Sequence, residues 1–298
     1  MANVTVAVPR ARLVLALPGK TFTALTRWPV IPLVILTALV LTAIFAPQLA
    51  PHDPIKSNLA KRNIPPAWTA KGTAEHLLGT DPVGRDILSR LIFGARVSLL
   101  VVSISLATGL LVGTTLGLIA GYFGGIIDEL ISRMVDIWLS LPFIVVALAA
   151  VILFGQSFGV MIGLLALLAW APFVRNVRAE VMVLKTRDYV ALAKVAGAST
   201  ARILVTHILP GVLNTVIVIA TLRVGQLILF EAILSFLGAG IPPPTPAWGV
   251  MVADGRNYVH DAWWVSFFPG LAIFLVVMSL NFLGDWVRDR FDPRLRQL

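Results

Sequence analysis

Six long apolar runs dominate the sequence and limit what the chain can fold into. They cover residues 29–46, 97–120, 137–154, 160–174, 212–234 and 265–284. A helix of about 20 apolar residues crosses the hydrocarbon core of a membrane and satisfies its own backbone hydrogen bonds there. Only 13% of the 298 residues are charged, whereas 58% are hydrophobic. The chain is therefore predicted to be an all-α integral membrane protein with six transmembrane helices.

The polar segments between these runs predict how the chain is oriented. Residues 1–28 form an N-terminal tail or interfacial helix, and residues 47–96 and 238–264 form loops on the opposite side. Residues 175–210 form a central loop on the side of the N-terminal tail, as does the C-terminal tail of residues 286–298. Fifteen Lys and Arg residues lie on the side of the termini, against eight on the other. Because basic residues concentrate on the cytoplasmic side, both termini are expected there.

Composition and motifs exclude several classes of protein. The absence of cysteine excludes disulfides and thiol catalysis. A net charge of +9 is explained by membrane orientation rather than nucleic-acid binding, because no basic–aromatic surface is present. The sequence has neither a nucleotide-binding motif nor a Ser/His/Asp arrangement, so no catalytic, cofactor or metal site is predicted. His52 and His76 are interpreted as solvated loop residues rather than metal ligands.

A series of glycines marks one face of the second apolar run. Gly109, Gly113, Gly117 and Gly121 recur every four residues, so they share one side of the expected helix. Small residues at this spacing allow two membrane helices to pack closely. Close packing is the first interpretation; in a transporter, such a face can also be where helices slide.

The fifth apolar run contains two ionisable residues. Arg223 and Glu231 lie eight residues apart on roughly one face, with Gln226 between them. Charges at membrane depth are unfavourable and usually face the interior of an assembly. We interpret these residues as a structural pair or subunit contact, with a place in the substrate pathway as the alternative.

The central polar stretch of residues 175–210 is expected to form two short helices separated by Gly197. Ser199 is placed to cap the second helix, and Pro210 is expected to stop it. A helix–glycine–helix element between two spans favours contact with a partner outside the membrane.

Part of this stretch resembles the EAA loop of ABC-importer permeases. The similarity covers YVALAKVAGAS at residues 189–199 and HILP at residues 207–210. Other segments resemble the second permease subunit of dipeptide, oligopeptide and nickel importers. They are HLLGTDPVGRDILSRLIFGARVSL, AGYFGG, LSLP at residues 139–142, FEAILSFLGAGIPPPTPAWG and FDPRLR. The resemblance spans residues 76–296 and implies the type I ABC importer transmembrane fold.

The resemblance implies that residues 175–210 couple this chain to an ATPase. The implied coupling residues are Ala191, Leu192, Ala193, Ala196, Gly197, Ala198, Ser199, His207 and Pro210. The glutamate of the family motif falls at Ala191, so this carboxylate is lost or moved, with Asp188 as the nearby candidate. The fit of the turn is therefore expected to carry the coupling.

The resemblance also implies an assembly in the bacterial plasma (inner) membrane. Its other members are a second permease subunit that forms a heterodimer with this chain, two ATP-binding subunits and an extracytoplasmic substrate-binding protein, with lipid around the spans. ATP and Mg are expected on the ATPase subunits, with no cofactor on this chain, which is a transport subunit rather than an enzyme. Di- or oligopeptides are the implied substrates. The alternatives are nickel or another small solute, and an ATP-independent secondary transporter.

Overall fold

The computed structural model describes residues 29–291, and this part of the chain is a bundle of helices without β-strands. The expected interfacial helix of residues 1–28 and the tail residues 292–298 lie outside it. The helices are α2 (Val30–Ile44), α3 (Ala46–Leu49), α4 (Ile87–Phe123), α5 (Gly125–Ser140), α6 (Phe143–Phe154), α7 (Phe158–Leu184), α8 (Asp188–Val195), α9 (Thr200–Arg202), α10 (Leu209–Phe236), α11 (Trp248–Gly255) and α12 (Trp264–Phe291).

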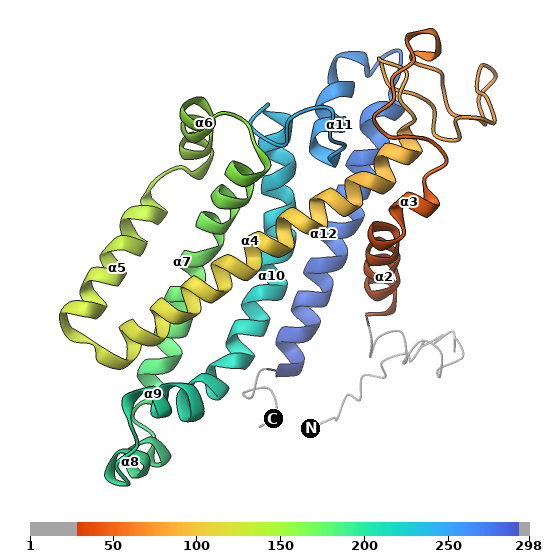
Figure 1. Ribbon diagram of the computed structural model, residues 1–298. Coiled ribbons are helices and arrows are strands. Elements are labelled where there is room, and N and C mark those ends of the chain that lie inside the picture. Colours follow the sequence, from red (N-terminus) through yellow and green to blue (C-terminus); the bar gives the residue numbers. More distant parts are fainter. Residues whose placement is uncertain (1–28, 292–298) are drawn as a thin grey trace, which may run out of the picture.

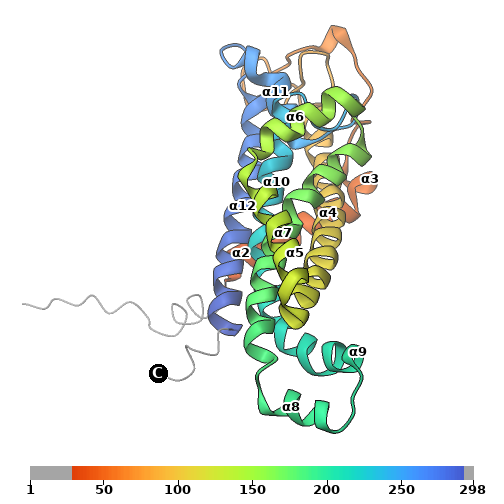
Figure 2. The ribbon, with the colours of Figure 1, turned by 90° about the vertical axis from the view of Figure 1, so that its left-hand side faces the viewer.

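The long helices lie side by side, and the short elements gather at the two ends of the bundle. α4 runs diagonally across α7, α10 and α12, while α2 lies against α4 and α12 (Figure 1). α8 and α9 gather at one end, and Figure 2 shows α8 beyond the end of α7. α11 and the loop between α3 and α4 cover the opposite end (Figure 1). The molecule thus has two distinct ends joined by apolar helices.

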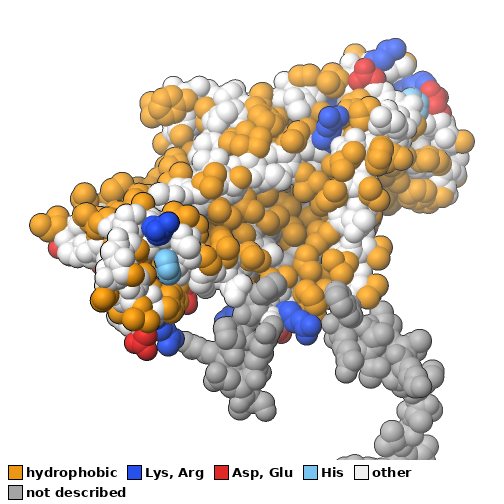
Figure 3. Space-filling view, turned by 60° about the horizontal axis from the view of Figure 1, so that its bottom comes forward, with side chains coloured by type: hydrophobic (Ala, Val, Ile, Leu, Met, Phe, Trp, Pro, Cys, Tyr) orange, Lys and Arg blue, Asp and Glu red, His pale blue; other side chains and the backbone are white. Residues whose placement is uncertain are grey.

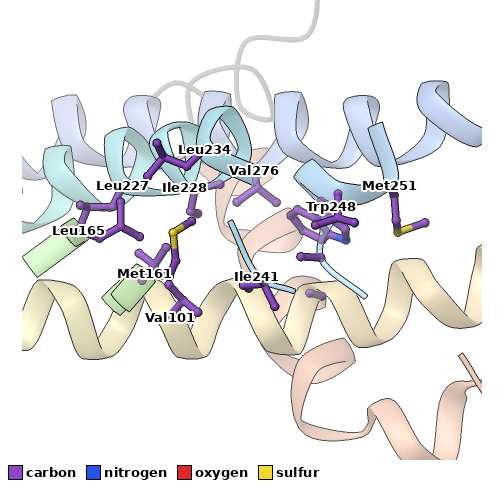
Figure 4. Packing of buried hydrophobic residues seen from close by; sticks show 14 of the residues in the cluster. Val101, Met161, Leu165, Leu227, Ile228, Leu234, Ile241, Trp248, Met251 and Val276 are labelled. Carbon is purple, nitrogen blue, oxygen red and sulfur yellow. The ribbon is translucent and has the colours of Figure 1, made fainter. Parts of the chain in front are cut away.

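The largest buried cluster lies where the long helices meet. Figure 4 shows side chains from α4, α7, α10, α11 and α12 converging there. Val101 of α4 and Leu227 of α10 are almost completely buried, as is Leu165 of α7. Protein interiors are close-packed, so these contacts fix the relative positions of helices that lie far apart in sequence.

The helices account for all six apolar runs, although not as six uniform spans. α4, α7, α12 and the continuous stretch Thr200–Phe236 are each long and apolar enough to cross a membrane. α5 and α6 together are also apolar and long enough, but they meet at a bend of 86°. α2 is a shorter apolar helix of 15 residues. An all-helical membrane protein is thus confirmed.

The expected third span of residues 137–154 is wrong as a single helix. The first residues of this run belong to α5, which ends at Ser140. Leu141 is extended with a ψ of 133°, and α6 starts after Pro142. Proline lacks an N–H and disfavours helical geometry in the residue before it. Most of the 16 residues of α5 precede this apolar run.

Two boundaries of the central polar stretch also differ from expectation. α7 continues to Leu184, so the first ten residues of the expected loop belong to a long helix. Pro210 does not stop the second short helix, because a π-helical turn lies directly before it, and such a local change of helix type accommodates a proline within a continuous helix. A π-helical turn, Ile203–Ile208, joins α9 to α10 without a break. The projecting element is consequently continuous with two long helices of the bundle.

Candidate functional site: a projecting helix and the polar contacts of the bundle

A glycine turn forms the tip of the projecting segment. α8 ends at Val195, and Gly197 follows with a φ of +77°. The N–H of Gly197 donates to the carbonyl of Lys194 at 3.0 Å, and the N–H of Ala198 donates to that of Ala193 at 3.0 Å. These two bonds make a Schellman motif, which ends a helix with a residue in the left-handed conformation. The position therefore favours glycine.

Conformation rather than crowding explains this glycine. A Cβ atom at Gly197 would have no neighbour within 4 Å in residues 29–291. Ser199 follows as the expected N-cap, because its Oγ accepts a hydrogen bond from the N–H of Arg202 at 3.3 Å. The local backbone of the turn is thus set by two sequence signals, one glycine and one serine.

The outward face of α8 is apolar. Leu192 is 68% exposed and Val195 is 88% exposed, and Tyr189 is also exposed. Ala191 and Ala196 are exposed, whereas Ala193 and Ala198 are half-buried. The space-filling view shows hydrophobic side chains with a few charged ones on the projecting lobe (Figure 3). Exposed apolar patches on projecting elements typically mark interaction surfaces.

The inward face of α8 is anchored to the bundle through Val190. This side chain is fully buried. It belongs to a second apolar cluster that contains Phe173 of α7, Ile208 of the π-turn and Val212 of α10. The predicted coupling residues His207 and Pro210 border this cluster, His207 half-buried and Pro210 exposed. A displacement of α8 would therefore be transmitted through this cluster and the π-turn to α10.

The glycine series of α4 lies along α7. Cβ atoms added at Gly109, Gly113, Gly117 and Gly121 would lie 2.4–2.8 Å from atoms of α7. At Gly113 the nearest atom is the backbone oxygen of Trp170. The two helices therefore approach each other closely over more than three turns, as small residues permit.

Arg223 and Glu231 do not pair with each other. Glu231 is buried, and its carboxylate accepts hydrogen bonds from Ser235 at 2.9 Å and from Ser98 of α4 at 3.2 Å. Arg223 instead donates to Gln226, one turn along the same helix. The predicted structural pair is therefore wrong. Glu231 joins α4 to α10, while Arg223 and Gln226 lie on a less buried face.

Two ion pairs between α5 and α7 were missed by the sequence interpretation. Arg178 donates to Asp128 with an Nη2–Oδ2 distance of 2.6 Å, and Arg175 donates to Asp136 at 2.6 Å. Both arginines had been assigned to the polar loop. The available signal was spacing: residues three apart on α7 and eight apart on α5 each share one helix face.

The opposite end of the bundle is held together by a charged network. Arg85 contacts Asp81 at 2.5 Å and Asp254 of α11 at 3.1 Å, and buried Arg90 contacts Asp254 at 3.4 Å. Burial raises the pKa of Asp254, and the neighbouring guanidinium groups counteract that rise. Residues of the HLLGTDPVGRD segment thus tie the loop before α4 to α11.

His52 and His76, which were expected to be solvated loop residues, lie together at this end. Their ring centroids are 4.8 Å apart, and His76 is buried. Nδ1 of His76 lies 3.0 Å from Oδ1 of Asp86, the residue that caps α4. The expectation of solvated histidines is wrong for His76, because loop packing brings residues 24 positions apart in sequence into contact.

Comparison with known proteins relates the chain to membrane transport components. The family model described as "Binding-protein-dependent transport system inner membrane component" matches residues 113–297. A model for the N-terminal TM domain of oligopeptide transport permease C matches residues 27–66. The dipeptide transport system permease protein DppC of Escherichia coli K12 is 47% identical over 90% of this chain and 89% of its own length. The di/tripeptide permease DppC of Pseudomonas aeruginosa is 43% identical over 89% and 87%.

Solved structures share the fold at lower identity. A chain of the inward-facing MetNI methionine ABC transporter matches with a TM-score of 0.56 and 20% identity, covering 69% of this chain and 98% of its own. A chain of an amino acid ABC transporter matches with a TM-score of 0.51 and 16% identity, covering 71% and 95%. At these identities the likeness concerns the arrangement of helices alone.

Proposed function

Since the chain belongs to the family of binding-protein-dependent transport system inner membrane components, we propose that it forms half of the pathway of an ATP-driven peptide importer. It is a multi-pass inner-membrane permease subunit with the type I ABC importer transmembrane fold, and ATP is hydrolysed on separate subunits. The observation that carries peptide as the substrate is the 47% identity, over 90% of this chain, to a permease named for dipeptide transport.

Deleting this chain from its host should reduce binding-protein-dependent uptake of a radiolabelled dipeptide to the background level, because half of the pathway would be missing. A plasmid copy should restore it. Uptake of a free amino acid by the same cells serves as the control. Unchanged dipeptide uptake, together with lost uptake of nickel or another small solute, would contradict peptide as the substrate.

We infer that α8 and the Gly197 turn are the element that docks onto the ATPase. Exposed Leu192 and Val195 offer an apolar surface at the projecting tip. The free energy falls when a partner removes such side chains from water. Buried Val190 supports transmission, because it links the docked helix through its apolar cluster and the π-turn to α10. Docking is thereby connected to the helices that must move during transport.

The departure from the family motif at Ala191 is compatible with this docking role. Ala191 is exposed, so the missing carboxylate leaves no buried gap. Asp188 lies in the first turn of α8, where the helix dipole favours a negative charge. We propose that the apolar tip and the turn carry the contact, with Asp188 as its acidic group.

Replacing Val195 with aspartate should weaken association with the ATPase at least about tenfold, because a carboxylate would be buried without a partner in an apolar contact. The fold should be preserved, since Val195 is 88% exposed. Co-purification of the ATPase and uptake in proteoliposomes measure the effect. Val195→Ser is the matched control, with a much smaller loss expected. Undiminished association of the aspartate variant would contradict docking through this residue.

We propose that the complete importer contains a second, different permease subunit, two ATP-binding subunits that carry ATP and Mg, and an extracytoplasmic binding protein. Partner ATPase and binding-protein subunits are properties of the family. Ile152, Leu153 and Phe154 at the end of α6 are strongly exposed and apolar, so either lipid or a partner subunit would cover them. Arg223 and Gln226 remain candidates for the pathway or for the contact between permeases.

We also propose that α8, α9 and both termini face the cytoplasm. The excess of Lys and Arg on this side supports the orientation. The end of α12 and the beginning of α2 point toward the end of the bundle from which α8 projects (Figure 1). An ATPase in the cytoplasm would then meet α8, while the binding protein would meet the end that carries α11.

A further inference from the structure

Three potential metal-binding side chains meet at the end of the bundle opposite α8. His52 follows α3, His76 belongs to the loop before α4, and Asp86 is the N-cap of α4. One donor atom from each side chain lies within 4.8 Å of the other two. The segments that carry them lie together at the loop-covered end of the bundle (Figure 1). The cluster is separate from α8 and from the polar residues of α10.

The distances within the cluster suit a small divalent ion. Nδ1 of His76 lies 3.0 Å from Oδ1 of Asp86, and Nδ1 of His52 lies 3.8 Å from Oδ2. Zinc bonds to nitrogen and oxygen are about 2.0–2.2 Å long, so ligand atoms of a tetrahedral site lie about 3.3–3.6 Å apart. The two histidine–carboxylate distances bracket this value, each to a different oxygen of Asp86, and the three donors lie within 4.8 Å of one another. Small side-chain rotations would bring the three donors onto one ion.

Hydrogen bonding within the protein leaves part of this cluster unsatisfied. Nδ1 of His52 and Nε2 of His76 are buried and have no hydrogen-bond partner. Buried polar atoms of this kind are uncommon and call for a missing partner. An ion at the centre would supply one for His52, whose Nδ1 faces Asp86.

The surroundings resemble the outer shell of a metal site. Oδ2 of Asp86 accepts hydrogen bonds from the N–H of Ser89 at 2.8 Å and from its Oγ at 2.7 Å, which orients the carboxylate. Metal-bound histidines commonly direct their second nitrogen at a carboxylate. Glu75 places one beside His76, but Nε2 and Oε1 are 4.0 Å apart, which is too long for a hydrogen bond, and Oε1 is bonded to Lys61.

The ion would have a route from solvent. The side chain of His52 is 33% exposed. It also lines a pocket of about 580 Å³ together with Phe93, Val97 and Pro246. Two imidazoles and one carboxylate favour zinc and similar transition metals over Mg²⁺ or Ca²⁺, which prefer oxygen ligands.

We propose that His52, His76 and Asp86 form a binding site for a divalent transition-metal ion of the zinc type, which fastens the loop before α4 to the start of that helix. The site lies outside the proposed docking and pathway residues, and the inference does not depend on what the importer carries. An ion here would join three chain segments at the base of the surface that faces the proposed binding protein.

Zinc binding by the assembled importer in lipid nanodiscs tests the site. After chelation and buffer exchange, Zn²⁺ should bind to the wild-type complex at one more site than to the His52→Ala complex, or at least about tenfold more tightly at that site. Isothermal titration and metal analysis of the washed complex provide the readouts. Partner subunits are identical in both samples, so their own metal sites cancel. Mg²⁺ should not compete.

His260→Ala is the matched control, because His260 is an exposed histidine at the same end but outside the cluster. It should bind zinc like the wild type. His76→Gln provides a second test. Its melting curve without metal is compared with that of the wild type to check that it folds. Zinc is then expected to raise the melting temperature of the wild type but not that of the variant. Equal zinc binding by wild type and His52→Ala would overturn the proposal, whatever the outcome of the peptide-uptake experiment.

Discussion

Replacing Gly197 with valine is expected to abolish ATP-driven uptake, whereas asparagine at the same position should preserve most of it. The residue has a φ of +77°, a conformation that disfavours L-residues by roughly 1–2 kcal/mol and β-branched residues in particular. Asparagine tolerates this region. Valine would therefore shift the turn away from the Schellman geometry and misdirect the outward face of α8. Uptake in proteoliposomes and co-purification of the ATPase measure the two effects.

The pair of substitutions separates conformation from size. Valine and asparagine have similar volumes, and a Cβ here meets no atom of this chain within 4 Å in the described range. A difference between the variants therefore reports the backbone requirement. Equal loss in both would mean that a partner crowds this position instead. Full activity in both would contradict a coupling role for the turn.

Replacing Gly113 with leucine should destabilise the permease by about 1–3 kcal/mol or more, which is the range for overpacked cores. A Cβ at this position would lie 2.4 Å from the backbone oxygen of Trp170, and backbone cannot move aside as a flexible side chain does. α4 and α7 would have to separate. We expect a lower melting temperature in detergent and a smaller monodisperse fraction in size-exclusion chromatography.

Gly163→Leu is the matched control for this experiment. Gly163 lies in α7, is exposed, and would place a Cβ in open space within residues 29–291. The same substitution there should leave the melting temperature nearly unchanged. A similar loss at both positions would assign the effect to leucine in a helix and not to the α4–α7 contact.

The features that the sequence predicted well depend on local chemistry. The apolar runs identified helices because length and hydrophobicity are properties of a single segment. Gly197 and Ser199 marked the turn because a left-handed residue and a capping hydroxyl act within a few residues of themselves. The break at Pro142 is equally local, and the motif LSLP contains its proline, but the prediction of one span over residues 137–154 overlooked it. The continuity of α7 and the passage of the helix through Pro210 were missed, because both boundaries depend on packing around them.

What the sequence by itself determined is thus the class of protein, its apolar helices and the turn at the tip of α8. Only the tertiary structure decided which polar side chains meet. Glu231 is hydrogen-bonded to Ser98 instead of pairing with Arg223, Arg178 pairs with Asp128, and His76 contacts Asp86. The partners in these three contacts lie 10 to 133 residues apart. Such contacts follow from how whole helices and loops pack. A periodic pattern in the sequence indicates which face of a helix is apolar, but not which other helix or loop packs against that face.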